Sequence, residues 1–205
     1  DERPIPPIGP WRMPQQRLLY LIFFLSGLSG LVYESMWSRY LRLFVGSAAT
    51  AQVLVLALFM GGMSLGAWLA GRRATKIARP IVAYGLVEGL IGLLAFAYPT
   101  IFGALTRLAY DSLFPALDGV AFTLVKWSLA GSLIFIPCLL LGMTFPLMSV
   151  GILRREPEKS GEILSFLYFS NSIGAAIGAT TIMLGVPVFR LLLWLTGIYT
   201  IVDEG

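Results

Sequence analysis

Histidine is absent from the 205 residues, and cysteine occurs once, at Cys138. Without an imidazole, the chain holds no histidine base, no histidine-ligated haem and no His-containing zinc site. One thiol makes neither an internal disulfide nor a thiolate metal cage. The sequence therefore predicts no metal site and no catalytic residue in this chain, and it assigns no cofactor.

Charge is also scarce, because only 13% of the residues are charged, whereas about 25% is usual in a soluble domain. Apolar residues make up 57% of the chain, and 22 Gly and 13 Phe are spread through long uncharged runs. This composition is typical of a protein that crosses the membrane several times. The predicted fold class is an all-α, polytopic membrane helical bundle.

Sequence motifs for soluble enzymes are missing as well. The chain has no GxGxxG, no GxxxxGK[ST] phosphate loop, no GxSxG elbow and no HExxH. The loops between apolar runs are too short to hold a soluble catalytic domain. The chain itself is therefore predicted not to be an enzyme.

Six apolar runs predict about six transmembrane helices, and a proline-rich segment, 1–16, precedes them as a cytoplasmic arm. Pro187 is expected to break the chain before the last run, whose twelve residues reach only about 18 Å. The transmembrane domain is predicted to cover 17–205. The predicted spans are 18–36, 48–70, 80–105, 127–153, 163–186 and 191–202.

Basic residues are distributed unequally between the loops. Ten Lys and Arg residues lie in the N-terminal arm and in the second and fourth loops, against five elsewhere. Because basic loops stay in the cytoplasm, the N-terminus and, after six spans, the C-terminus are predicted to be cytoplasmic. Basic residues at the edges of apolar runs suit anionic lipid head groups and not nucleic acid.

Small residues recur every four positions on three spans, which allows helices to approach closely in lipid. The interpretation adopted is packing within one bundle rather than a seam between two subunits. The residues are Gly62, Gly66 and Ala70 on the second span, Gly85 and Gly89 with Gly92 following on the third, and Ser170, Gly174 and Gly178 on the fifth.

Three polar side chains inside the spans form the candidate polar or cation site. Glu88 lies about 12 Å into the third span, where an ionised group costs on the order of 3 kcal/mol, so it needs protein, water or a cation nearby. It is either a proton or cation site or a hydrogen-bonded structural carboxyl. Glu34 lies beside Tyr33, Trp37 and Tyr40 and is interpreted mainly as part of an aromatic anchor at the interface. Asn171 is expected to bridge helices.

Five segments together resemble a known family, the bacterial spermidine-synthase-like integral membrane proteins, over about residues 17–190. These fused proteins combine a transporter-like membrane domain with an aminopropyltransferase-like domain. The matching segments are Tyr33-Glu34-Ser35-Met36-Trp37-Ser38-Arg39, Phe59-Met60-Gly61-Gly62-Met63-Ser64-Leu65-Gly66, Glu88, Pro137 with Gly142-Met143-Thr144-Phe145-Pro146, and Tyr168-Phe169-Ser170-Asn171-Ser172-Ile173-Gly174.

The resemblance implies a six-helix unit similar to half of a major-facilitator transporter, usually followed by a cytoplasmic Rossmann-like domain. The Gly-rich nucleoside-binding loop and the acidic aminopropyl-transfer residues of that soluble domain are absent from this sequence. The family's catalysis is therefore not carried over to this chain.

Three functions remain open from the sequence. The first is a non-catalytic membrane module that anchors or scaffolds a catalytic domain or a protein partner. The second is a structural accessory subunit of a larger membrane complex. The third is a half-transporter for a cation or a polyamine, in which Glu88, Glu34 and Asn171 recognise the cargo. All three place the chain in the bacterial inner membrane, with the lipid bilayer and membrane proteins as partners.

Overall fold

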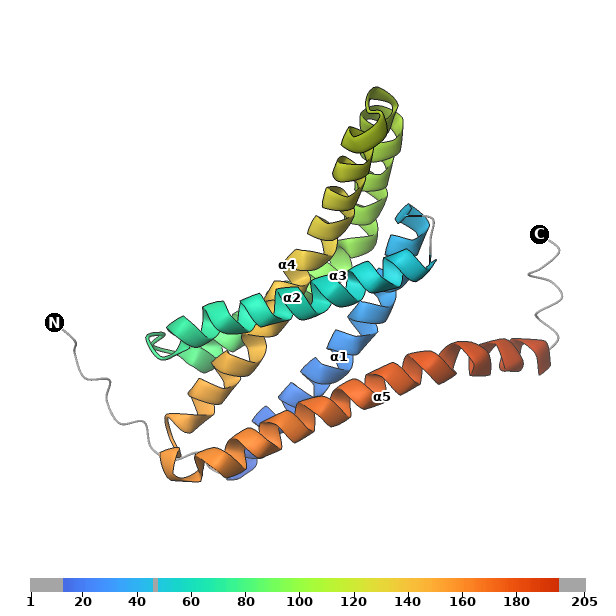
Figure 1. Ribbon diagram of the computed structural model, residues 1–205. Coiled ribbons are helices and arrows are strands. Elements are labelled where there is room, and N and C mark those ends of the chain that lie inside the picture. The colour runs from blue at the N-terminus through green and yellow to red at the C-terminus, as the bar shows by residue number, and fades with distance from the viewer. Residues whose placement is uncertain (1–12, 46–47, 196–205) are drawn as a thin grey trace.

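Five long helices make up nearly all of the described chain in the computed structural model (Figure 1). The structure describes residues 13–45 and 48–195, and no strand occurs among them. The predicted all-α class is confirmed. The elements are α1 (Met13–Val45), α2 (Ala48–Ala74), α3 (Pro80–Leu108), the π-helical turn η1 (Ala109–Leu113), the 3-10 turn η2 (Phe114–Ala116), α4 (Gly119–Leu153), the 3-10 turn η3 (Pro157–Lys159) and α5 (Ser160–Leu195).

All five α-helices are long and apolar enough to cross a membrane. They contain between 27 and 36 residues, which corresponds to roughly 40 to 54 Å at 1.5 Å per residue. A hydrocarbon core is about 30 Å thick, so helices of this length tilt or extend beyond it. The expected membrane helical bundle is therefore present, with five helices in the described residues.

The predicted break at Pro187 is wrong. Helix α5 continues through Pro187 to Leu195, so residues 191–195 of the predicted sixth span belong to the fifth helix. A proline removes one backbone hydrogen bond, which an apolar helix in a membrane tolerates. The rest of that span, 196–202, and residues 1–12 of the predicted arm lie outside the described residues. Residues 13–16 of the arm open α1 instead.

Helix α1 extends nine residues beyond the predicted end of the first span. Arg39 and Arg42 lie beyond the predicted end of that span, and both side chains are exposed on one face of a helix that continues to Val45. Trp37 and Phe44 on the other face are buried. A charged residue on a helix therefore did not mark its end, because the apolar face continued beneath it.

Helix α4 is the most buried of the five and begins eight residues before the predicted span. Gly119 opens it with a φ of 55°, a left-handed conformation that a glycine adopts without a Cβ penalty. The helix is unbroken through Pro137 and Pro146. It contacts each of the other four α-helices and therefore lies at the centre of the bundle.

The closest helix pairs are not neighbours in the sequence. Helix α2 packs most extensively on α4, and α1 packs on α5, whereas α3 lies mainly on α4. Successive helices run in opposite directions, so each of the two closest pairs is parallel. Figure 1 shows α2 crossing α4, and α5 separating from α1 toward its C-terminal half.

The bundle has two ends of different chemistry. The basic end contains the connections 75–79 and 154–159, with Lys76 and Arg79 in the first. The aromatic end contains the last turns of α1 and the connection 109–118. There the Phe44 ring meets Tyr110 edge-on at 5.8 Å, and the Tyr110 hydroxyl donates to the Phe44 carbonyl at 2.9 Å. This contact fixes the end of α3 against α1.

Arg154 ties the end of α4 to the connection between α2 and α3. Its guanidinium donates to the carbonyl oxygens of Thr75 at 2.5 Å and Ile77 at 2.7 Å. Longer bonds reach the carbonyls of Ala74 and Ala78, both at 3.3 Å. The side chain thereby satisfies carbonyls that the end of α2 leaves without an intrahelical partner.

Candidate functional site

Glu88 pairs with a serine of the first helix. The Ser26 hydroxyl donates a hydrogen bond to Glu88 Oε1, which joins α1 to α3. Ser26 is only 7% exposed, and Glu88 is half-buried. A carboxyl group inside a membrane span is costly without polar partners, and Ser26 supplies one.

Tyr84 adds a second polar group to this pair. It lies one helical turn before Glu88 on the same face of α3, is 3% exposed, and packs edge-on against Phe23 at 6.1 Å. Its hydroxyl lies near both the Glu88 carboxyl group and the Ser26 hydroxyl. We call Ser26, Tyr84 and Glu88 the polar triad.

Asn171 lies on the other helix that flanks this part of α1. Gly27, next to Ser26, presses against it, and a Cβ placed on Gly27 would lie 2.7 Å from Asn171 Oδ1. Only a glycine allows this approach of α1 to α5. Glu88 and Asn171 therefore lie at the same height of α1, on α3 and α5 respectively.

Glu34 lies elsewhere. It is two turns further along α1 than the polar triad, is half-buried, and lies near Cys138 of α4. The three predicted site residues therefore have different neighbours and do not line one pocket. Glu88 and Asn171 share a level of the bundle, whereas Glu34 is separated from them by roughly 10 Å of helical rise.

The aromatic residues beside Glu34 do not form the expected interfacial anchor. Trp37 is 1% exposed, stacks on Tyr33 at 6.1 Å and lies 6.4 Å from Tyr98 of α3. Tyr40 contacts Tyr98 and Phe102 at 5.4 and 4.8 Å. The spacing was interpreted as a surface belt, but Trp37 lies within the core, and Tyr33 and Tyr40 are half-buried against it.

Two of the three small-residue stripes lie against another helix. On α2, a Cβ on Gly62 would lie 2.7 Å from the Cβ of Cys138, and one on Gly66 would lie 2.9 Å from the carbonyl carbon of Leu139. Ala70, at the end of this stripe, is buried. From the opposite side, a Cβ on Gly142 would lie 2.6 Å from Met63 Cα. Both helices thus need glycine where they cross.

The stripe on α5 meets α1 in the same way. The Ser170 hydroxyl donates to the Tyr20 carbonyl at 2.8 Å. A Cβ on Gly174 would lie 3.0 Å from the Phe24 carbonyl carbon, and one on Gly178 would lie 3.2 Å from that of Leu28. The approach of backbone to backbone continues along this whole stripe.

The stripe on α3 contacts no other helix of the described chain. Gly85, Gly89 and Gly92 are exposed, and a Cβ on any of them would meet nothing within 4 Å. Leu86 and Leu93, which flank the stripe, are 71% and 62% exposed. Within residues 13–45 and 48–195, this stripe takes no part in the expected packing within one bundle, and we call it the open α3 face.

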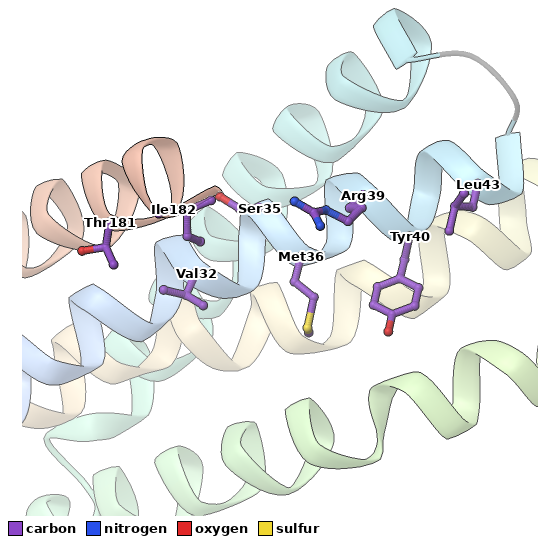
Figure 2. A pocket seen from close by; sticks show the side chains of 9 residues that line it. Val32, Ser35, Met36, Arg39, Tyr40, Leu43, Thr181 and Ile182 are labelled. Atoms are coloured by element: carbon purple, nitrogen blue, oxygen red, sulfur yellow. The ribbon is translucent and has the colours of Figure 1, made fainter. Parts of the chain in front are cut away.

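A groove of about 610 Å³ opens between α1 and α5 where the two helices separate (Figure 2). Its walls are mostly apolar, and Arg39 stands at its edge. A smaller polar hollow of about 440 Å³ adjoins it and shares Ser35 and Arg39 with it. The groove is lined by Val32, Ser35, Met36, Arg39, Tyr40, Leu43, Thr181, Ile182 and Gly185.

Comparison of the chain with protein-family models, with curated proteins and with solved structures gave no significant match. The resemblance to spermidine-synthase-like membrane proteins therefore stays a prediction.

Sequence reasoning found Glu88 but missed its partners. Ser26 and Tyr84 looked unremarkable because serine and tyrosine are common in apolar helices, and only the helix arrangement brings Ser26 to α3. Tyr84 had one available signal, its four-residue spacing from Glu88.

Proposed function

We propose that the chain is a non-catalytic membrane module that anchors or scaffolds a catalytic domain or a protein partner in the bacterial inner membrane. The open α3 face carries this proposal. Its small residues have the spacing of a helix contact, yet no helix of the described chain covers them. Helix α3 is also the least buried of the five spans.

The chemistry of the chain supports a structural role. The sequence offers no imidazole, and the sole thiol, Cys138, is fully buried against α2, where a substrate does not reach it. Serine and threonine hydroxyls inside the spans mostly donate to carbonyls of their own helix, and Ser170 of α5 donates to the Tyr20 carbonyl of α1. We place the basic end in the cytoplasm, because the two connections there contain most of the basic loop residues.

A photo-crosslinking amino acid at position 89 tests the scaffold proposal in native membranes. The expected product is one discrete adduct with a protein partner, and it should disappear when Gly92→Leu fills the neighbouring position of the stripe. The matched control is position 61, because Gly61 is also exposed and a Cβ there meets nothing within 4 Å. Adducts with lipid alone at both positions would refute a partner at α3.

A second function, a half-transporter for a cation or a polyamine, is favoured by the polar triad. A carboxyl group within a span that lies beside two buried hydroxyl groups is an arrangement that protons or cations can use. The test is uptake of labelled spermidine and of protons into vesicles that contain the chain. Transport that Glu88→Gln abolishes would establish this function, and no uptake above empty vesicles would exclude these two cargoes.

A further inference from the structure

We infer that the groove between α1 and α5 is a binding site for one anionic phospholipid, with its phosphate held by Arg39 and Arg42 and an acyl chain in the groove. This inference does not depend on the scaffold role, because it concerns a different face of the bundle. It requires only that the helices cross a membrane, as their length and hydropathy indicate.

The two arginines are placed to hold one phosphate. They are three residues apart on α1, so their stems leave neighbouring positions on one face, and both side chains are exposed. Both line the polar hollow, together with Ser38 and Gln52 as further hydrogen-bond donors. Guanidinium groups bind phosphate oxygens through paired, charge-assisted hydrogen bonds.

The arginines have no competing carboxylate. Within residues 13–45 and 48–195, neither Arg39 nor Arg42 forms an ion pair or a hydrogen bond, and no acidic residue lines either cavity. Glu34, the nearest acidic residue along α1, lies toward Cys138 of α4 instead. Two cations without an ion-pair partner beside an apolar groove therefore favour a ligand that has both a negative charge and an apolar portion.

The groove supplies the apolar part of the site. Val32, Met36 and Leu43 from α1 and Ile182 from α5 line it (Figure 2). Its volume of about 610 Å³ lies within the range of about 300 to 1,000 Å³ that is usual for ligand sites. Because the cavity and the polar hollow share Ser35 and Arg39, the head group and the chain of one molecule can occupy both.

Charge and position select a phospholipid over a soluble anion. The groove lies between two helices that are long and apolar enough to cross a membrane, so a lipid can enter it from the bilayer. Each Lys or Arg near the head group increases the affinity of an anionic lipid about fivefold. Two arginines therefore correspond to a preference of roughly 30-fold for an anionic over a zwitterionic head group.

Native mass spectrometry of the delipidated full chain tests this site, with phosphatidylglycerol and phosphatidylcholine titrated in the same detergent. We expect one phosphatidylglycerol molecule to bind more tightly than any further lipid molecule. The double variant Arg39→Gln with Arg42→Gln should lose roughly 30-fold in affinity for it. The matched control, Arg107→Gln with Lys126→Gln, removes two charges from the same end outside both cavities and should retain this lipid.

A second variant separates the groove from the charges. Gly185 lines the groove and a Cβ there meets nothing within 4 Å, so Gly185→Leu fills the acyl-chain space while both arginines remain. It should weaken both lipids and keep their ratio. Equal phosphatidylglycerol affinity in the double variant and its control would overturn the site. Displacement of the lipid by millimolar inorganic phosphate would also overturn it, because the site would then be a simple anion site.

Discussion

Helices α2 and α3 carry the same pattern and use it differently. Each has glycines in helical register, yet α2 is pressed onto α4 at Gly62 and Gly66, whereas Gly85 and Gly89 of α3 face no helix of the described chain. Spacing therefore shows that a helix can be approached closely, but it does not show which helix approaches. The comparison also distinguishes a helix contact that folding requires, on α2, from a helix face that another molecule can cover, on α3.

The largest effect is expected at the α2 seam. Gly66→Ala places a methyl group where the Leu139 carbonyl already lies, so α2 and α4 must separate. Overpacking of this kind costs about 3 kcal/mol, and the free energy of unfolding in mixed detergent micelles should fall by that amount. Gly61→Ala is the control, since that position is open. Equal stability of the two variants would show that the seam is looser than described.

The second largest effect is expected at the basic end, where Arg154 joins α4 to the connection 75–79. Arg154→Gln removes a cation that bonds four carbonyls around the connection 75–79, at a cost of about 2 kcal/mol. Proteinase K should then cut this connection faster, as read by mass spectrometry of the fragments. Arg73→Gln, an exposed change on α2 nearby, should leave the cutting rate unchanged. If both variants are cut alike, Arg154 does not hold this connection.

Much of this fold could be predicted, and the reasons for the failures are physical. Long uncharged runs established the helical class, because a bilayer accepts little else. Helix ends were harder to predict. Arg39 lies on an exposed face of α1, and Pro187 lies within an apolar stretch of α5. Neither residue ends its helix. Which helices become neighbours depends on tertiary packing. Glu88 could thus be identified as a candidate, but Ser26 could not be identified as its partner.

A smaller effect is expected at the polar triad. Ser26→Ala removes the donor to Glu88, and hydrogen bonds between membrane helices contribute about 0.6 kcal/mol on average. Unfolding in mixed micelles should shift by that amount in a wild-type background. In a Glu88→Leu background, the same change should have no effect, because the acceptor is already gone. An additive double variant would mean that the two side chains do not interact.

No loss of stability is expected at the open α3 face. Gly89→Ala meets no neighbour and gains helix propensity, so the isolated chain should be unchanged or more stable by up to about 1 kcal/mol. Together with Gly66→Ala, this change compares the same substitution on a covered and on an open stripe. Destabilisation at Gly89 comparable with that at Gly66 would show that α3 is packed within the chain.

The central claim is that the open α3 face holds a protein partner. Native mass spectrometry of the protein extracted from its own membrane in mild detergent tests it most directly, with wild type, Gly89→Leu and the control Gly61→Leu in parallel. The account predicts an assembly heavier than the chain for wild type and Gly61→Leu, and loss of a protein component in Gly89→Leu. An identical assembly mass for all three proteins would contradict it.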